Sequence, residues 1–130
     1  MNNFLRTAAF AAWLEQLSDL KGKSRILARI NAASAGNFGD CEPVGEGVSE
    51  MRIDFGPGYR VYFMRDGAAV YLLLCAGDKS TQKADIAAAL KMARQVKAER
   101  TALDQVKESN GRPRPKAKPA VESKGKARKG

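Results

Sequence analysis

The chain has 130 residues, of which 44% are hydrophobic, and its formal net charge at pH 7 is +9. This length and composition suit one small domain with its own core, and no apolar run approaches the ~20 residues of a transmembrane helix. There is no histidine and only two cysteines, which excludes the usual zinc ligand sets and an imidazole base. The first residues lack the features of a signal peptide. We therefore expect a cytoplasmic protein with no metal, no cofactor and no membrane partner.

The positive charge is concentrated near the C-terminal end. Residues 110–130 hold eight bases and one acid, so they carry +7 of the net charge of +9. Proline and glycine are frequent there and large apolar side chains almost absent, a composition typical of disorder. We predict a folded domain over residues 1–108 and a disordered basic tail over residues 109–130. The tail is either a solvated extension or a nonspecific electrostatic hold on RNA, DNA or the ribosome.

Two helices are predicted after a short strand at residues 4–6. Thr7 is a typical capping residue, and the apolar residues that follow it fall at helical spacing. A glycine then breaks the period, and a second helix is expected from about Ser24 to Gly36. Neither helix is long enough to be stable alone, so we expect an antiparallel hairpin that packs on a sheet. A polar, glycine-rich loop should continue through Gly47.

From Val48 the hydrophobic period changes to two, which indicates strands. In this first strand Arg52 falls on the side away from the apolar residues and is expected to face away from the core. A Gly-Pro-Gly turn at residues 56–58 leads into a strand over residues 59–64, and an Asp-Gly pair after it is typical of a tight hairpin. The next strand, over residues 69–75, is apolar throughout, as in a central strand buried on both faces.

A last helix is predicted after Ser80 or Thr81, either of which can cap it. Asp85 falls in its first turns, where the helix dipole favours an acid. Beyond about Lys97 the apolar stripe weakens, so we expect the helix to project and to fray before Asn110. The predicted fold class is α+β, with an antiparallel sheet, an N-terminal helical hairpin and a C-terminal helix.

Three cations are candidates for chemistry: Arg52, Arg60 and Lys79. Arg60 begins the strand that pairs with the strand of Arg52, and Lys79 follows the end of the next strand. The sheet is therefore expected to gather the three in a concave patch. Fixed guanidinium and ammonium groups would stabilise the negative charge that a phosphodiester gains in a pentacoordinate state. The alternative is a set of solvated surface cations, and the spacing does not decide between the two.

Five segments in order resemble the toxins of the RelE/ParE superfamily, in particular the subgroup of addiction module killer proteins (HigB/RelE-like). They are FAAWL at residues 10–14, GNFGD at 36–40, GVSEMRI at 47–53, GPGYRVYF at 56–63 and GDKSTQ at 77–82 with DI at 85–86. The resemblance covers about residues 4 to 96 and leaves the basic tail outside. It implies a RelE/ParE-like β-α-α-β-β-β fold closed by a last helix, and the role of a type II toxin.

The resemblance also implies a reaction. Many members of the superfamily cleave messenger RNA in the ribosomal A site without a metal, by attack of the ribose 2′-hydroxyl on the adjacent phosphate. On this basis Arg60 matches an arginine that stabilises the transferring phosphate. Arg52 falls near a basic residue that acts as a base or a phosphate clamp, and Lys79 takes the place of one that assists the leaving group or the phosphate. Asp85 aligns where some members have tyrosine or histidine, and it is either an acid or base or a helix cap. Tyr59 either stacks on RNA bases or belongs to the core.

The sequence leaves three functions open. The first is a ribosome-dependent mRNA endonuclease neutralised by a cognate antitoxin, which we expect to be a small helix-turn-helix protein. The second is a non-enzymatic toxin that binds a protein such as DNA gyrase. The third is an inactive toxin-like module that only binds an antitoxin. The three cations favour the first function over the second, while the lack of histidine and the open role of Asp85 leave the third in place.

Overall fold

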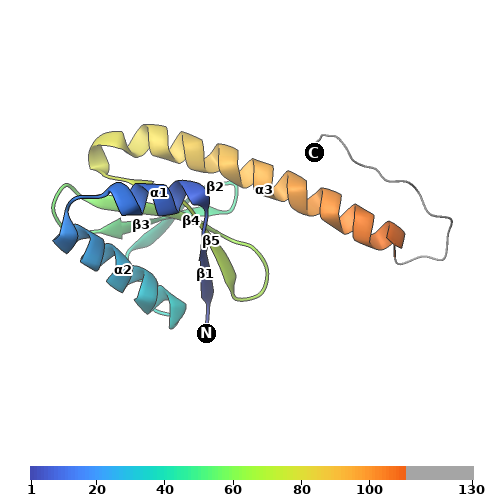
Figure 1. The fold of residues 1–130 in the computed structure, drawn as a ribbon, viewed down its shortest axis with the longest axis horizontal. Helices are drawn as coiled ribbons and strands as arrows, with labels where there is room; N and C mark the ends of the chain where they lie inside the picture. Colours follow the sequence, from blue (N-terminus) through green and yellow to red (C-terminus); the bar gives the residue numbers. More distant parts are fainter. Residues whose placement is uncertain (111–130) are drawn as a thin grey trace. The chain divides into compact units, whose positions relative to one another are not determined.

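The structure is a computed structural model that describes residues 1–110, with side chains described as far as Val106. The strands are β1 (Asn3–Arg6), β2 (Cys41–Gly45), β3 (Val48–Ile53), β4 (Tyr59–Arg65) and β5 (Val70–Gly77). The helices are α1 (Ala8–Gln16), α2 (Leu20–Ser34) and α3 (Gln82–Asn110), and a 3-10 turn (Lys79–Thr81) precedes α3 (Figure 1). Most of the predicted tail at 109–130 lies outside the described residues. Of the helices described, none is long and apolar enough to cross a membrane.

The five strands form one sheet in the order β1-β5-β4-β3-β2. The predicted antiparallel pairing is confirmed for β3, β4 and β5 and is wrong for β1, which runs parallel to β5. The segment predicted as a loop contains β2, which pairs with β3. Proline and glycine are typical of loops, so the sequence of this segment did not indicate a strand. Pro43 is tolerated because β2 is an edge strand, where a missing backbone donor leaves no ladder bond unmade.

Helices cover both faces of the sheet within residues 1–97. On β4, Tyr59, Val61 and Phe63 pack into one core cluster together with side chains of α1 and α2. The alternate residues Tyr62 and Met64 pack into a second cluster with the buried alanines of α3. The strand at the centre of the sheet is therefore buried on both sides. The mixed α+β class is confirmed, with five strands and three helices.

The helical hairpin differs from the prediction at one end. Thr7 caps α1 as predicted, since its hydroxyl accepts a hydrogen bond from the Phe10 amide at 3.2 Å. The second helix begins at Leu20, four residues earlier than expected, because Asp19 caps it by accepting from the Gly22 amide at 3.0 Å. Gly22 therefore lies inside the first turn of α2 and does not separate the two helices. A Cβ at this position would lie 2.5 Å from the Tyr59 ring, so the glycine allows α2 to approach β4.

The last helix begins through a cap that the sequence pattern did not single out. The side chain of Asp78 accepts from the Ser80 amide at 2.8 Å and caps the 3-10 turn, while Thr81 completes a capping box. The helix α3 then continues to Asn110, and its fraying stays a prediction. The described chain divides into two compact units at residue 97. In the second unit, every described side chain from Ala98 onward is exposed.

Candidate functional site

The structure brings the three predicted cations to one pocket of about 360 Å³, which we call the cation pocket. It is lined by Asp40, Arg52, Ile53, Asp54, Gly56, Pro57, Gly58, Arg60 and Lys79. The strand register explains the arrangement. Arg60 lies directly opposite Arg52 on one side and Gly77 on the other, and the chain leaves β5 at Gly77 to reach Lys79. The expectation of a concave patch is thus met in its geometry, while the chemical roles of these residues stay predictions.

The turn between β3 and β4 forms one wall of the cation pocket. Gly56 and Gly58 have φ values of 58° and 82°, in the left-handed region that glycine adopts without strain. The Gly58 amide donates to the Phe55 carbonyl at 3.1 Å and closes the turn. The next residue, Tyr59, ties this wall to the helical hairpin, because its hydroxyl donates to Asp19 at 2.7 Å.

Arg60 has an unmet hydrogen-bonding group. Its Nε is buried and has no hydrogen-bond partner within the described part of the chain. A buried donor on a charged group is costly to leave unpaired. Such exceptions call for an explanation, and a binding site for an anion is one. Neither Arg60 nor Lys79 forms an ion pair with any described residue, so both charges are available to a ligand.

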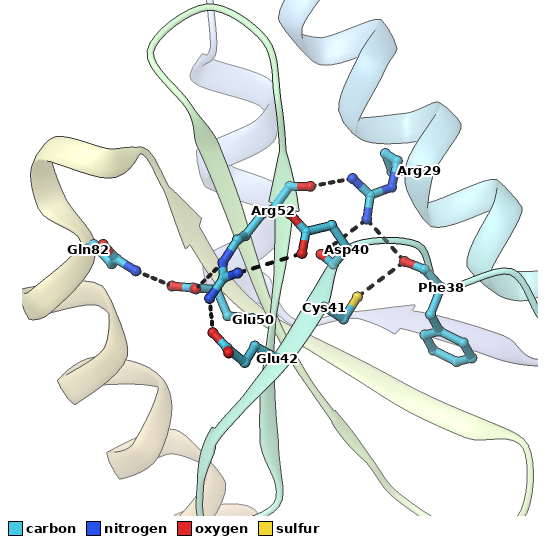
Figure 2. Close-up of polar contacts among 8 residues, drawn as sticks. All are labelled: Arg29, Phe38, Asp40, Cys41, Glu42, Glu50, Arg52 and Gln82. Atoms are coloured by element: carbon cyan, nitrogen blue, oxygen red, sulfur yellow. Dashed lines mark hydrogen bonds and ion pairs between the residues drawn. The ribbon is translucent and has the colours of Figure 1, made fainter.

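Arg52 has the opposite environment. Its guanidinium pairs with three carboxylates, those of Asp40, Glu42 and Glu50 (Figure 2). Its Nε lies 3.1 Å from a Glu50 oxygen and its Nη1 lies 3.6 Å from an Asp40 oxygen, while its Nη2 donates to Glu42. The charge of Arg52 is therefore already balanced inside the protein. Its side chain lines the pocket, but an anion must compete for it.

Glu50 is a site residue that the sequence reading missed. It is 1% exposed and accepts hydrogen bonds from the Tyr62 hydroxyl at 3.0 Å and from the Gln82 amide at 2.8 Å, as well as from Arg52. Burial and the bond to Glu50 raise the pKa of Tyr62 above its usual range. The sequence signal was present in part, because Glu50 and Arg52 alternate onto one face of β3. The pattern assigned that face to solvent, whereas α3 covers it.

Arg29 is a second missed residue, and it supports the pocket from α2. Its guanidinium donates to the backbone carbonyls of Arg52, Phe38 and Asp40, the last two at 3.0 and 3.3 Å. Figure 2 shows it on the far side of Arg52 from Glu50. These bonds hold the loop before β2 against the end of β3. They thereby place Asp40 at the wall of the pocket.

Asp85 lies outside the lining of the cation pocket. It accepts from the Thr81 hydroxyl at 2.5 Å and packs against Gly77, where a Cβ would collide with its carboxylate. These contacts join the first turn of α3 to the end of β5. In this position Asp85 supports the helix start, the second of the two roles that the sequence left open, and its role as an acid or base stays a prediction.

Tyr59 is 5% exposed and belongs to the core. Its ring meets the ring of Trp13 edge-on, with 6.1 Å between centroids. The hydrogen bond to Asp19 is the largest influence on both partners: with burial it raises the pKa of Tyr59 to about 12, and it lowers the pKa of Asp19. A ring in this position is covered and offers no face to an RNA base.

The comparisons with known proteins cover the same region. Residues 12–98 match the model of the family described as "Phage derived protein Gp49-like (DUF891)". The chain is also 46% identical over 90 residues to an uncharacterized protein of Haemophilus influenzae, and the aligned part covers 69% of this chain and 91% of that protein. The family match includes every residue that lines the cation pocket.

Proposed function

This chain belongs to the phage-derived Gp49-like family, and from that premise we propose that it is a type II toxin that cleaves messenger RNA on the ribosome. The family is associated with the toxins of toxin–antitoxin systems, which implies an antitoxin as partner. The observation that carries the nuclease proposal is the buried, unpaired Nε of Arg60 in a pocket shared with Lys79. A phosphodiester supplies the acceptor and the negative charge that this donor lacks.

In the proposed reaction the ribose 2′-hydroxyl attacks the adjacent phosphorus. A bond forms between O2′ and phosphorus, the bond from phosphorus to O5′ breaks, and the products are a cyclic phosphate and a free 5′-hydroxyl. Arg60 donates to the phosphate oxygens as their charge grows. The Lys79 ammonium gives a proton to the departing O5′, which becomes the free 5′-hydroxyl, and the amine regains a proton from solvent. Two lining carboxylates, Asp40 and Asp54, lie in the pocket where the proton of the 2′-hydroxyl has to be accepted.

The ribosome supplies what this pocket does not. Among the described residues, the lining of the pocket offers three cations to hold an RNA in line, and correct positioning contributes a large part of the rate in such reactions. Free RNA is therefore expected to be cut poorly. Translated messages, whose codons the ribosome holds in place, should be cut within codons.

The test compares two arginines of the same strand. Arg60→Ala removes the unpaired donor and should lower the cleavage rate by about 10²- to 10³-fold, the effect of losing one preorganised donor to a developing negative charge. Arg65→Ala is the matched control, because Arg65 also lies on β4 but does not line the pocket and donates to the Gly67 carbonyl at 3.1 Å. Each variant is expressed from a tight promoter, growth is followed, and new 5′ ends of transcripts are mapped by primer extension.

The outcomes separate the possible functions. In-frame cuts with the wild type and with Arg65→Ala, but not with a folded Arg60→Ala, support the nuclease. Equal cutting by Arg60→Ala and Arg65→Ala would overturn the role of Arg60. Supercoiling by purified gyrase is assayed in parallel. Intact messages with inhibited supercoiling would assign the protein to the gyrase-binding class, and intact messages with normal growth would make it an inactive module.

A further inference from the structure

We propose that Glu42 sets the affinity of the cation pocket for RNA. Glu42 pairs with Arg52 until a phosphate of the RNA takes the place of the Glu42 carboxylate. The inference rests on the proposed function in so far as the incoming anion is RNA. It begins from the register of the sheet. Glu42 and Glu50 lie directly opposite each other on β2 and β3, where two like charges destabilise the pair. Arg52 relieves this repulsion by bonding to both (Figure 2).

The two glutamates differ in how firmly they are held. Glu50 is buried, and the Tyr62 hydroxyl and the Gln82 amide fix it in addition to Arg52. The side chain of Glu42 is 59% exposed on the edge strand, and within the described residues Arg52 is its one polar partner. Glu42 is therefore free to leave, while Glu50 keeps the Nε side of Arg52 in place.

The exchange is favourable for a phosphate. An exposed ion pair contributes little to stability, since both side chains remain solvated and lose conformational freedom. A phosphate offers an arginine two parallel, charge-assisted hydrogen bonds. When Glu42 turns away, Arg52 is left with the fixed Glu50 and the more distant Asp40, and its Nη2 becomes available to the incoming group.

The position of Arg52 indicates the class of ligand. Arg52 and Arg60 are directly opposite residues of neighbouring strands, and both line the cation pocket. Opposite residues of an antiparallel pair lie about 5 Å apart. An RNA strand that places one phosphate at Arg60 therefore brings its adjacent phosphate within reach of Arg52. The exchange favours a single-stranded polyanion with successive phosphates over a mononucleotide, which has only one phosphate to place.

The test is binding, measured apart from cleavage. The probe is a short fluorescent RNA with 2′-O-methyl groups, which cannot be cut because the attacking hydroxyl is blocked. Glu42→Gln in the full chain should bind this probe about three- to tenfold more tightly than the wild type at low salt. The slope of log K against log salt should steepen by about 0.7, as one more phosphate is neutralised. A mononucleotide should show no such gain.

The matched control is Glu46→Gln, which removes the same charge from the same hairpin. Glu46 lies in the turn between β2 and β3 and pairs with Arg94 and Lys97, at the opposite end of these strands from the pocket. Glu42→Gln should exceed Glu46→Gln in RNA affinity, and its gain should disappear when it is combined with Arg52→Ala.

Equal affinities of Glu42→Gln and Glu46→Gln, or a gain that persists without Arg52, would overturn the inference. Failure of the nuclease proposal gives a different result. Messages in cells would then stay uncut, while Glu42→Gln would still bind RNA more tightly than Glu46→Gln. Thermal unfolding followed by circular dichroism verifies that each variant is folded. A variant with Glu42→Gln that binds less tightly than the wild type would also refute the role of Glu42.

Discussion

Arg52 and Arg60 show how neighbouring residues of one kind acquire different roles. They lie opposite each other on β3 and β4, yet three carboxylates surround the first, and the second has a buried donor without a partner in the described chain. Arg52 therefore joins β2 to β3 as well as lining the pocket. Arg60 makes no such contribution, so its replacement is expected to change function more than stability.

The pair of Tyr59 and Asp19 makes a prediction at the residue scale. Tyr59→Phe removes the hydrogen bond to Asp19 and should lower the free energy of unfolding by about 1 kcal/mol at neutral pH. The pKa of Tyr59 is raised from 10 to about 12 in the folded state. A raised pKa stabilises the fold below pH 10, and that stabilisation is lost as the pH rises toward 12. The difference between wild type and Tyr59→Phe should therefore shrink over this interval.

For Asp19, the acid of the same pair, the stabilisation depends on pH in the opposite direction. The hydrogen bond from Tyr59 lowers the pKa of Asp19 below 3.8, so its stabilisation is present above pH 3.8 and is lost as the pH falls further. Urea unfolding from pH 3 to 12 measures the loss of stability in both the acid and the alkaline range. Tyr71→Phe is the control, because no hydrogen bond of the Tyr71 hydroxyl is found within the described residues. A constant difference between wild type and Tyr59→Phe across this range would contradict the assignment.

At the scale of elements, the junction of β5 and α3 leaves no room for a side chain at Gly77. A Cβ at Gly77 would collide with the Asp85 carboxylate and lie 2.6 Å from the Thr81 hydroxyl. Gly77→Ala should therefore lower the free energy of unfolding by about 1–3 kcal/mol, the usual cost of overpacking. Because Lys79 lies two residues further along the chain, Gly77→Ala should displace it and weaken RNA binding.

A double-mutant cycle identifies the cause. Asp85→Ala removes the nearest colliding atoms, so Gly77→Ala should cost less in that background than in the wild type. Chemical denaturation of the four proteins gives the coupling free energy. Additive effects would show that the glycine is required for another reason. The junction matters for function because it carries the chain from the sheet into the turn that holds Lys79 at the pocket.

At the scale of the whole molecule, the family match and the first compact unit end at nearly the same residue. The match covers residues 12–98 and the unit covers residues 1–97. Beyond this point α3 buries none of its described side chains, and both Leu103 and Val106 are more than half exposed. The residues that support the cation pocket all lie before it.

A shortened chain tests this division. A protein ending at Thr101 should melt within a few degrees of the full chain, because the removed side chains that are described bury little apolar surface. Leu90→Ala is the contrasting change, since Leu90 packs against the second core cluster; it should cost about 1–2 kcal/mol. A large loss of melting temperature on shortening would show that residues after Thr101 stabilise the first unit.

The sequence alone determined the elements whose signals are local. Thr7 caps its helix, the period of two yields β3, β4 and β5, and tight turns make consecutive strands neighbours. Because Arg52, Arg60 and Lys79 stand at the ends of those strands, their meeting in one pocket could also be predicted from the sequence.

Only the tertiary structure decided the pairing of the two outer strands and the environment of each charge. The segment of β2 forms a strand because it pairs with β3. The strand β1 pairs in parallel with β5, although most of the domain's sequence separates the two. Glu50 is buried because Gln82 and α3, 32 residues further along the chain, cover its face of the sheet. Burial and ion pairing depend on which elements meet in space. Periodicity reports only on near neighbours in the chain, so it could not show that Arg52 is already paired while Arg60 is not.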